Sequence, residues 1–406
     1  MGLYIGTSFV TNSDGDGLTH KSFQPIGINT EFVGIITASD GAAYDNFGYS
    51  VAVGSGRIVV GAFGYDNETY IFDLDRNQVG IITASDAAGF DRFGESVAVG
   101  SGKIVVGAYV KDIGSNSSQG AAYIYDLDGT NENRITASDG AAGDYFGYSV
   151  AVGSGRIVVG APDNNINSNA DQGSAYIFDL NGNQLEIITA SDGAAGDHFG
   201  YSVAVGSGRI VVGAYEAHIG SNADQGAAYI FDLNGNQLGI ITAFDGGTND
   251  KFGTSVAVGS GRIVVGSNAS GQGAAYIYDL DGNNEIKITD PNGSADDRFG
   301  NSVAVGSGRI VLGADGIDIG ANANQGAAFI YDLDGTNENR ITVSDDADSD
   351  YFGIDVAVGS GKIVVGAYVK DIGSNNSQGA AYMWKTNKAL TSLSDYYDEI
   401  VDHYRY

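Results

Sequence analysis

The Phe-Gly pair repeats seven times along this chain, and the repetition constrains the fold more than any other feature of the sequence. The seven pairs are spaced 46 to 53 residues apart. They begin at Phe47, Phe93, Phe146, Phe199, Phe252, Phe299 and Phe352. A period of this length indicates a repeat architecture in which each unit packs against its neighbours. The number of units therefore determines the architecture.

Each unit contains four short segments with the composition of β-strands. In the third unit they are Ser149–Gly153, Arg156–Ala161, Ser174–Leu180 and Ile187–Ala190. These segments are rich in Val, Ile, Tyr and Thr, and clusters of Gly, Asp, Asn and Ser separate them, as expected of strands joined by tight turns. Four strands in a unit of roughly 40 to 50 residues are typical of a propeller blade. We therefore predict an all-β fold, a seven-bladed β-propeller of four-stranded blades.

The two ends of the repeat region are offset by one strand. Ile35–Ala38 precedes the first Phe-Gly pair, whereas the last unit stops after its third segment, Ala380–Trp384. We predict that Ile35–Ala38 completes the seventh blade, because this pairing removes an open sheet edge. The expected organisation is an N-terminal extension (1–34), the propeller (35–384) and a C-terminal tail (385–406).

Composition and charge exclude several classes of partner. A formal charge of −30 argues against binding nucleic acid through its phosphates and against docking on anionic membranes. No apolar run approaches the roughly 20 residues of a transmembrane helix, so we expect no membrane insertion. The first residues show no basic start followed by an apolar core, so we expect no Sec-type signal peptide. The chain has no cysteine and therefore no disulfides.

The Phe-Gly pair, followed by S-V-A-V-G and then V-V-G-A, resembles the FG-GAP repeat, which forms the blades of the integrin alpha-subunit propeller and of many bacterial and viral propellers. The resemblance covers Ile35 to Trp384 in seven copies. It implies a seven-bladed propeller that serves adhesion or protein binding, in a family with few catalysts. Integrin-like blades often carry a calcium loop between the first two strands. Here a Ser-Gly hairpin such as Ser154-Gly155 takes its place, so we expect no metal at that position.

Three acidic patterns leave calcium open as an alternative, although we expect no cofactor. An Asp stands two residues before each Phe of the Phe-Gly pairs, usually with a second Asp five residues earlier, and tight loops use such residues to accept backbone N–H groups. The turn at Asp126–Asn131 resembles half of an EF-hand loop but also suits a hairpin. Asn12–Gly17 fits the first six positions of a calcium loop and lacks the closing acidic residue.

Seven of the 20 basic residues occupy one hairpin position, once in each unit. They are Arg57, Lys103, Arg156, Arg209, Arg262, Arg309 and Lys362. We expect them on one face of the disc, paired with turn aspartates, with an anionic or acidic partner as the alternative. The four histidines fall at unrelated places and no nucleophile stands out, so we expect no catalytic residues.

The connection between the second and third segments differs most between units, and in two units it is shorter than in the others. In propellers this connection shares a face with the loops that join consecutive blades, and integrin-like propellers use that face for ligands. We predict that exposed residues of these loops contact a protein or glycan ligand, with neutral drift as the alternative. The predicted contacts are Tyr109, Lys111, Ile113, Tyr215, His218 and Ile219.

The tail after Trp384 differs in composition from the repeats. It lacks glycine, and its apolar residues recur at three- and four-residue steps, the pattern of an amphipathic helix. We predict that this helix attaches the propeller to a partner protein of an assembly, or that it packs on the propeller rim. The apolar positions are Leu390, Leu393, Tyr397, Ile400, Val401 and Tyr404.

Together these features predict a non-enzymatic binding or adhesion propeller. We favour a structural or host-recognition component of a virus particle, such as a phage tail, located at the virion surface or extracellularly. A bacterial surface or secreted adhesin is the first alternative. A polysaccharide-acting enzyme is the second.

Overall fold

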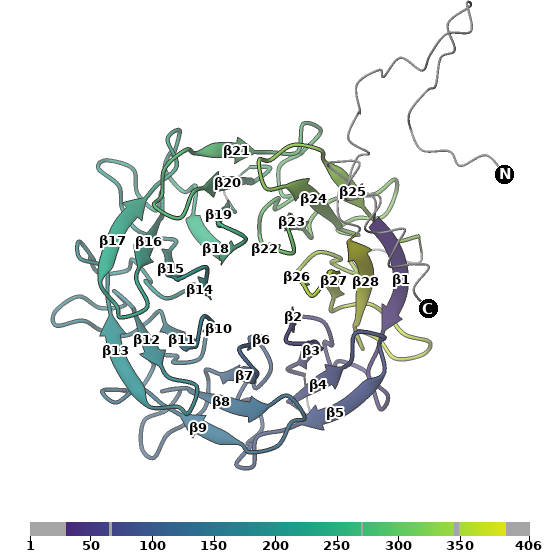
Figure 1. Cartoon of the computed structure of the whole chain (residues 1–406), viewed down its shortest axis with the longest axis horizontal. Helices are drawn as coiled ribbons and strands as arrows, with labels where there is room; N and C mark the ends of the chain where they lie inside the picture. The colour runs from purple at the N-terminus through teal and green to yellow at the C-terminus, as the bar shows by residue number, and fades with distance from the viewer. Residues whose placement is uncertain (1–29, 65–66, 269–270, 345–348, 387–406) are drawn as a thin grey trace, which may run out of the picture.

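The computed structural model describes residues 30–64, 67–268, 271–344 and 349–386. Their strands form seven four-stranded antiparallel sheets in a ring, which confirms the predicted seven-bladed propeller (Figure 1). The predicted tail helix, with all six of its apolar positions, lies outside the described residues. The calcium-like segment Asn12–Gly17 also lies outside them.

Each blade runs from an inner strand at the axis to an outer strand at the rim, in chain order except in blade 7, whose outer strand is β1. The strands of blades 1 to 4 are β2 (Val51–Gly54), β3 (Arg57–Ala62), β4 (Glu68–Phe72) and β5 (Gln78–Ile82); β6 (Val97–Gly100), β7 (Lys103–Ala108), β8 (Ala121–Asp126) and β9 (Asn133–Ile135); β10 (Ser149–Gly153), β11 (Arg156–Ala161), β12 (Ser174–Phe178) and β13 (Gln184–Ile188); and β14 (Ser202–Gly206), β15 (Arg209–Ala214), β16 (Ala227–Phe231) and β17 (Gln237–Ile241). Those of blades 5 to 7 are β18 (Phe252–Gly259), β19 (Arg262–Ser267), β20 (Ala274–Tyr278) and β21 (Ile286–Ile288); β22 (Val303–Gly306), β23 (Arg309–Ala314), β24 (Ala327–Asp332) and β25 (Asn339–Ile341); and β26 (Val356–Gly359), β27 (Lys362–Ala367), β28 (Ala380–Thr386) and β1 (Thr30–Ile36).

Strand β1 closes the ring as the outer strand of the seventh blade, as predicted. It pairs antiparallel with β28, with Ile35 opposite Tyr382 and Ile36 opposite Ala381. The strand begins at Thr30, five residues before the expected start, and ends at Ile36. Its extra residues add an aromatic contact, because the ring centroids of Phe32 and Trp384 are 5.2 Å apart.

The fourth strand of each blade was predicted too far along the chain. In blade 3 it spans Gln184–Ile188 rather than Ile187–Ala190. The N–H of Gly193 donates a hydrogen bond to the carbonyl of Ala190, at 3.2 Å, so the chain is already turning there. The first and second strands of this blade match their predicted bounds, and the third ends two residues early.

The hydrophobic core lies between blades, and the phenylalanine of each Phe-Gly pair is fully buried in it. Phe146 of blade 3 packs edge-on against Tyr176, with 5.2 Å between the ring centroids. It belongs to the same hydrophobic cluster as Val105 of blade 2. Edge-to-face pairs of this kind contribute about 0.5–1.5 kcal/mol to stability beyond the free energy gained by burying their surface. Each repeated phenylalanine therefore joins two blades.

The glycines of the repeated V-V-G-A and Phe-Gly motifs allow the backbones of adjacent blades to touch. A Cβ on Gly107 of blade 2 would lie 2.1 Å from the carbonyl oxygen of Gly147 in blade 3. Gly147 itself has a φ of 94°, and its N–H donates to the carbonyl of Gly160 at 3.0 Å. A side chain at Gly107 would separate the two blades, so this position requires glycine.

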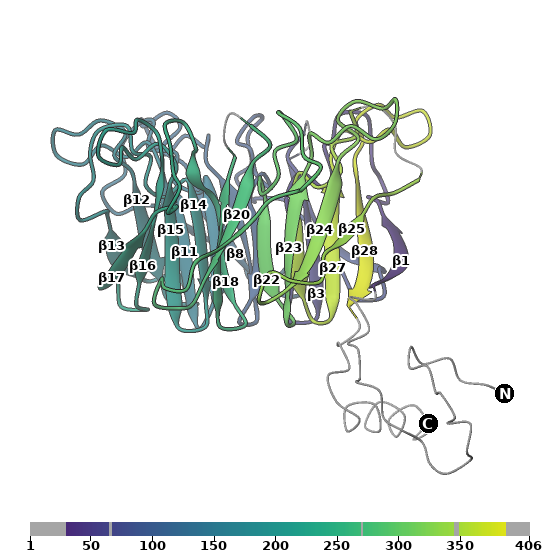
Figure 2. The same ribbon diagram turned by 90° about the horizontal axis from the view of Figure 1, so that it is seen from above.

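The disc has two unlike faces (Figure 2). We call the side with the short turns between first and second and between third and fourth strands the hairpin face. We call the side with the longer connections the loop face. Within the described part of the chain, no helix is long and apolar enough to cross a membrane.

Candidate functional site

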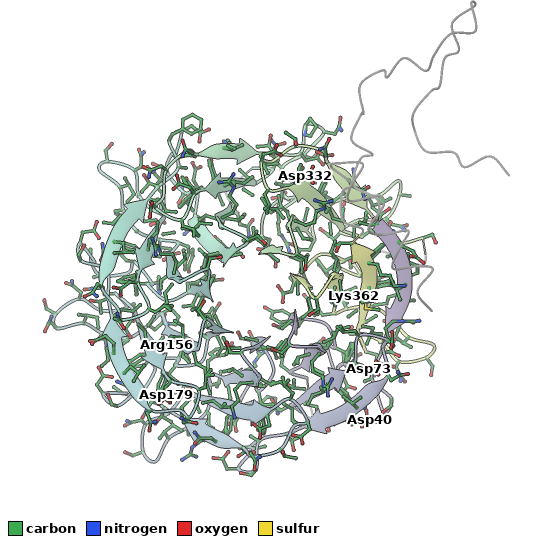
Figure 3. All side chains as sticks on the ribbon, in the orientation of Figure 1. Asp40, Asp73, Arg156, Asp179, Asp332 and Lys362 are labelled. Atoms are coloured by element: carbon green, nitrogen blue, oxygen red, sulfur yellow. The ribbon has the colours of Figure 1, made fainter. Side chains whose placement is uncertain are left out.

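The cations of the hairpin face stabilise the ring. Lys103 pairs with Asp126 at 2.5 Å, and Arg309 pairs with Asp332 at 2.6 Å, as predicted. Other members reach across to the next blade instead, as when Nε of Arg57 donates to the carbonyl of Leu127 at 3.1 Å. Two further members of the set, Arg156 and Lys362, lie nearer the axis than the turn carboxylates Asp73 and Asp179 (Figure 3).

The repeated aspartates organise turns and loops. In the turn between third and fourth strands, Asp179 accepts the N–H groups of Asn181 and Asn183 at 2.9 Å each. The amide of Asn183 also donates to this carboxylate and holds the pKa of Asp179 below its ordinary value. Before the Phe-Gly pair, Asp144 accepts the N–H of Ala141 at 2.6 Å. Among the residues that the structure describes, no group of three or more His, Cys, Asp or Glu is placed to hold a metal ion.

We predict that calcium does not stabilise the propeller, because oxygens of these carboxylates already accept backbone N–H groups. Calorimetric melting curves in a chelator and in millimolar Ca²⁺ are expected to coincide. A rise of the melting temperature by several degrees in Ca²⁺ would show that a site binds the folded state.

The prediction that Lys111 is an exposed ligand contact is wrong. The residue is 5% exposed. Its ammonium group donates to the carboxylate of Asp91 at 2.9 Å and to the carbonyl of Asp86 at 2.7 Å. These two partners stabilise the buried ammonium group, because burying its charge without them would cost free energy.

The other predicted contacts are also less exposed than expected, except His218, whose side chain is 62% exposed. Ile113 and Ile219 pack against the hydrophobic clusters beneath their loops. Tyr109 and Tyr215 are half-buried in contacts with other aromatic rings. Side chains of these loops also donate hydrogen bonds to the next blade. For example, Nδ2 of Asn116 donates to the carbonyl of Gly140 at 3.1 Å.

The loop face instead presents a circle of unlike side chains that the sequence analysis did not single out. They stand directly before each Phe-Gly pair, and we call them the face ring: Asn46, Arg92, Tyr145, His198, Lys251, Arg298 and Tyr351. All seven are partly exposed, and all seven have left-handed backbones, with φ between 54° and 61°. Asn and His tolerate this conformation, whereas Arg, Lys and Tyr rarely adopt it. A left-handed non-glycine residue costs about 1–3 kcal/mol and is concentrated at functional sites.

Face-ring side chains contact neighbouring blades. The guanidinium of Arg92 lies 4.9 Å from the ring centroid of Phe63 in blade 1. Tyr145 packs against Tyr109 of blade 2, at 5.5 Å between centroids. These contacts provide a second explanation for the face ring, namely that it joins the blades.

His198 of blade 4 makes polar contacts of this kind. Its Nδ1 lies 2.9 Å from the carboxylate of Asp163 in blade 3, and its Nε2 lies 3.2 Å from Glu216. The hydrogen bond to Asp163 raises the pKa of His198, with Glu216 adding to the effect against the opposing effect of burial. The imidazole thus connects two blades at the loop face.

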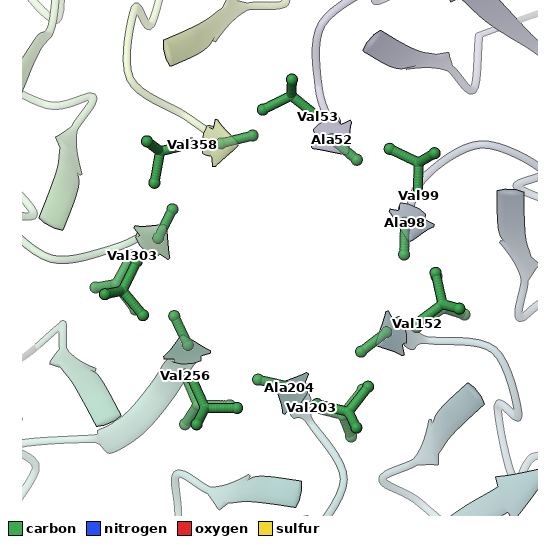
Figure 4. Close-up of a pocket in the computed structure, with 18 of the residues that line it drawn as sticks. Ala52, Val53, Ala98, Val99, Val152, Val203, Ala204, Val256, Val303 and Val358 are labelled. Atoms are coloured by element: carbon green, nitrogen blue, oxygen red, sulfur yellow. The ribbon is translucent and has the colours of Figure 1, made fainter. Parts of the chain in front are cut away.

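Inside the face ring, the central channel opens in a cavity of about 260 Å³. Its lining varies around the circle: Tyr49, Ser50, Glu95, Ser96, Tyr148, Tyr201, Thr254, Ser255, Asn301, Ser302, Ile354 and Asp355. Below this mouth the channel wall is uniform, built from the Val-Ala-Val triplets of the seven inner strands, such as Val51, Ala52 and Val53 (Figure 4). Variation is therefore concentrated at the mouth, where a ligand could reach it.

A hydrogen bond at the mouth links consecutive inner strands. In blades 1, 2, 5 and 6 a serine Oγ accepts the N–H of the first valine in the next inner strand, as Ser302 accepts from Val356 at 3.1 Å. In blade 7 Asp355 takes this position and accepts the N–H of Val51 at 2.7 Å. Burial raises the pKa of Asp355 to about 6, although it also accepts a hydrogen bond from the hydroxyl of Ser302.

We predict a pH-dependent stability difference between the protein and the variant Asp355→Ser. The folded state holds the Asp355 proton more tightly than the unfolded state, so the free energy of unfolding falls as pH rises from about 4 to about 6. Two pKa units correspond to at most about 3 kcal/mol, which the variant would recover above pH 6. Urea titrations at pH 4 and pH 7.5 measure this difference. An equal effect of the substitution at both pH values would contradict it.

A signal for the face ring was present in the sequence. Its positions lie between an invariant Asp and an invariant Phe-Gly pair, yet they differ in nearly every blade. The predicted contacts lie instead in the connections between second and third strands, which differ in length as well as in sequence.

Comparison with known families agrees with this architecture. A family model described as FG-GAP repeat matches seven segments, which are residues 31–72, 77–125, 130–178, 183–231, 236–278, 283–331 and 336–384. A search of curated proteins gave no match.

Proposed function

Because the chain belongs to the FG-GAP repeat family, whose propellers are typically non-catalytic, we propose that it is a binding or adhesion module that holds its ligand on the loop face. The observation that carries this proposal is the face ring. Its positions cost stability in five blades and carry five different residue types in seven blades. A purely architectural left-handed position would carry the same residue throughout, as the hairpin position does with a serine in all seven blades, from Ser55 to Ser360.

The chemistry of the loop face suits a protein or glycan ligand. Tyrosines, arginines and a histidine surround the mouth, and such side chains are favoured in binding interfaces because they combine apolar area with polar ends. With a net charge of −30, nucleic acid remains an unfavourable partner.

Oriented immobilisation tests which face binds. Because the chain has no cysteine, one introduced thiol can fix its orientation on a maleimide surface. Asp281→Cys, on the hairpin face, would leave the loop face free, and His218→Cys would turn the loop face toward the support. We expect the first surface to capture cells from a broad bacterial panel and the second to capture few. Equal capture in both orientations would contradict the proposal.

For the setting of this module we propose the surface of a virus particle, attached to a partner protein through residues 385–406. A rigid, strongly acidic disc with one variable face suits a component displayed in many copies, since its charge favours solubility. The second candidate is a bacterial surface or secreted adhesin. Mass spectrometry of particles purified from the source culture distinguishes the two, and finding the protein only in the cell envelope would contradict the first.

A further inference from the structure

A cleft of about 260 Å³ lies on the loop face between blades 1 and 2. It is lined by Tyr44, Asn46, Phe63, Gly64, Phe90 and Arg92. Blade 1 has a connection of five residues between β3 and β4, whereas blade 2 has twelve between β7 and β8. The short connection therefore leaves the aromatic side chains beside it uncovered.

Tyr44 and Phe90 occupy the same position in blades 1 and 2, three residues before the Phe of the Phe-Gly pair, and both have left-handed backbones with φ of 69° and 71°. The other five blades carry small or polar residues with the same backbone at this position: Gly143, Gly196, Asn249, Asp296 and Ser349. An aromatic residue is disfavoured in this conformation. Tyr44 is also 51% exposed and Phe90 is 78% exposed. Backbone strain and exposed aromatic area thus coincide at equivalent positions of two adjacent blades. The fold itself does not require an aromatic residue there.

The polar side chains of the cleft leave it close to neutral. Arg92 lies over the ring of Phe63 at 4.9 Å, and its guanidinium pairs with Glu95 at 3.3 Å. Asn46 supplies a neutral amide that can both donate and accept hydrogen bonds. With the charge of Arg92 compensated and the protein strongly acidic, a negatively charged ligand gains little here.

We propose that this cleft is a subsite for one ring of a neutral saccharide. A pyranose has an apolar C–H face that stacks on an aromatic ring, and hydroxyl groups that need donors and acceptors at its edge. Tyr44 and Phe90 provide the first, and Asn46 and Arg92 provide the second. The volume is below the roughly 300–1,000 Å³ of sites for drug-sized ligands, so it suits a single ring rather than a folded partner. The inference rests on the loop face being the binding face, but Tyr44 and Phe90 lie outside the face ring.

Saturation-transfer NMR with defined sugars tests the subsite. The probes are maltotriose, mannotriose, chitotriose and the matched pair lactose and 3′-sialyllactose, at millimolar concentrations. The double variant Tyr44→Gly/Phe90→Gly removes both aromatic side chains and installs the residue of blades 3 and 4, so it should melt at the same or a higher temperature. Phe244→Ser is the matched control, because Phe244 is 75% exposed and lies outside the cleft.

We expect at least one neutral sugar to bind the full chain and the Phe244→Ser control equally, and to bind the double variant at least tenfold more weakly. Absence of binding by all neutral probes, unchanged binding to the double variant, or a preference for sialyllactose over lactose would each overturn the subsite. The outcome is independent of the oriented-surface experiment, which uses neither Tyr44 nor Phe90. Capture of cells by the loop face without binding of any probe would therefore reject the subsite and leave the proposed function intact.

Discussion

A chain that starts at residue 38 is expected to unfold at a much lower temperature than the full chain, or not to fold at all. This deletion removes β1 and leaves β28 as an open edge. Ile36 is 2% exposed, and the ring of Phe32 lies against Trp384 and Tyr382. Phe32 is itself 51% exposed. Losing the burial of Ile36, at about 1.5–3 kcal/mol, and uncovering the buried Trp384 and Tyr382 would together remove a large part of a typical stability of about 5–15 kcal/mol. The open edge would also promote aggregation.

The matched control is a chain that starts at residue 30, which keeps all of β1. Calorimetry and light scattering on the two truncated proteins separate the strand from the segment before it. We expect the longer protein to melt close to the full chain. If the chain starting at residue 38 were equally stable and monomeric, closure by β1 would not hold the ring together.

The substitution Gly107→Ala is expected to destabilise the propeller by about 3 kcal/mol, at the upper end of the usual cost of overpacking. The added Cβ would lie 2.1 Å from the carbonyl oxygen of Gly147, and backbone in two packed sheets cannot move aside as a side chain can. The backbone of Gly107 does not have a positive φ, so steric overlap is the reason for the loss. Equivalent glycines occupy the same place in every blade, and each has the next blade's Phe-Gly glycine as its neighbour.

Gly89→Ala is the control for this prediction. A Cβ at Gly89 would meet nothing within 4 Å, and its φ is not positive. Urea titration of the two variants should show a normal midpoint for Gly89→Ala and a clearly lower one for Gly107→Ala. Equal midpoints would mean that the blades can separate at low cost.

The fold was predictable because its determinants recur. Seven copies of the Phe-Gly repeat determine the number of blades. The unmatched segment around Ile35 determines which strand completes the seventh blade. Errors occurred at strand ends, where local turns decide the outcome. The Gly193 N–H bonded to the Ala190 carbonyl is one such turn, and composition alone does not show where it begins.

The predicted ligand contacts lie on the loop face, but most of them are less exposed than the sequence suggested. Lys111 looked like a solvated cation, and the structure buries it beside Asp91, a residue 20 positions earlier in the sequence. Ile113 looked like an exposed apolar contact, and it packs under its own loop. Side-chain direction in irregular loops depends on contacts with neighbouring loops and blades, which sequence periodicity does not encode. The left-handed backbone of residues such as Tyr351 likewise emerges only from the folded loop.

The most direct test of the account replaces Tyr145, Lys251 and Tyr351 by asparagine in one protein and measures both its stability and its binding. Arg298 is left in place because its partner Asp315 is fully buried, and an unpaired charge there would destabilise the fold. Relief of three left-handed residues, at about 1 kcal/mol or more each, should offset the lost aromatic contacts of the tyrosines, at about 0.5–1.5 kcal/mol each. It should also offset the lost ion pairs of Lys251 with Glu216 and Asp224, at about 0–1 kcal/mol each, because all three side chains are partly exposed. We predict an unchanged or higher melting temperature, together with loss of capture when the protein is fixed through its hairpin face. A markedly lower melting temperature with capture intact would show that the face ring joins the blades and does not hold the ligand.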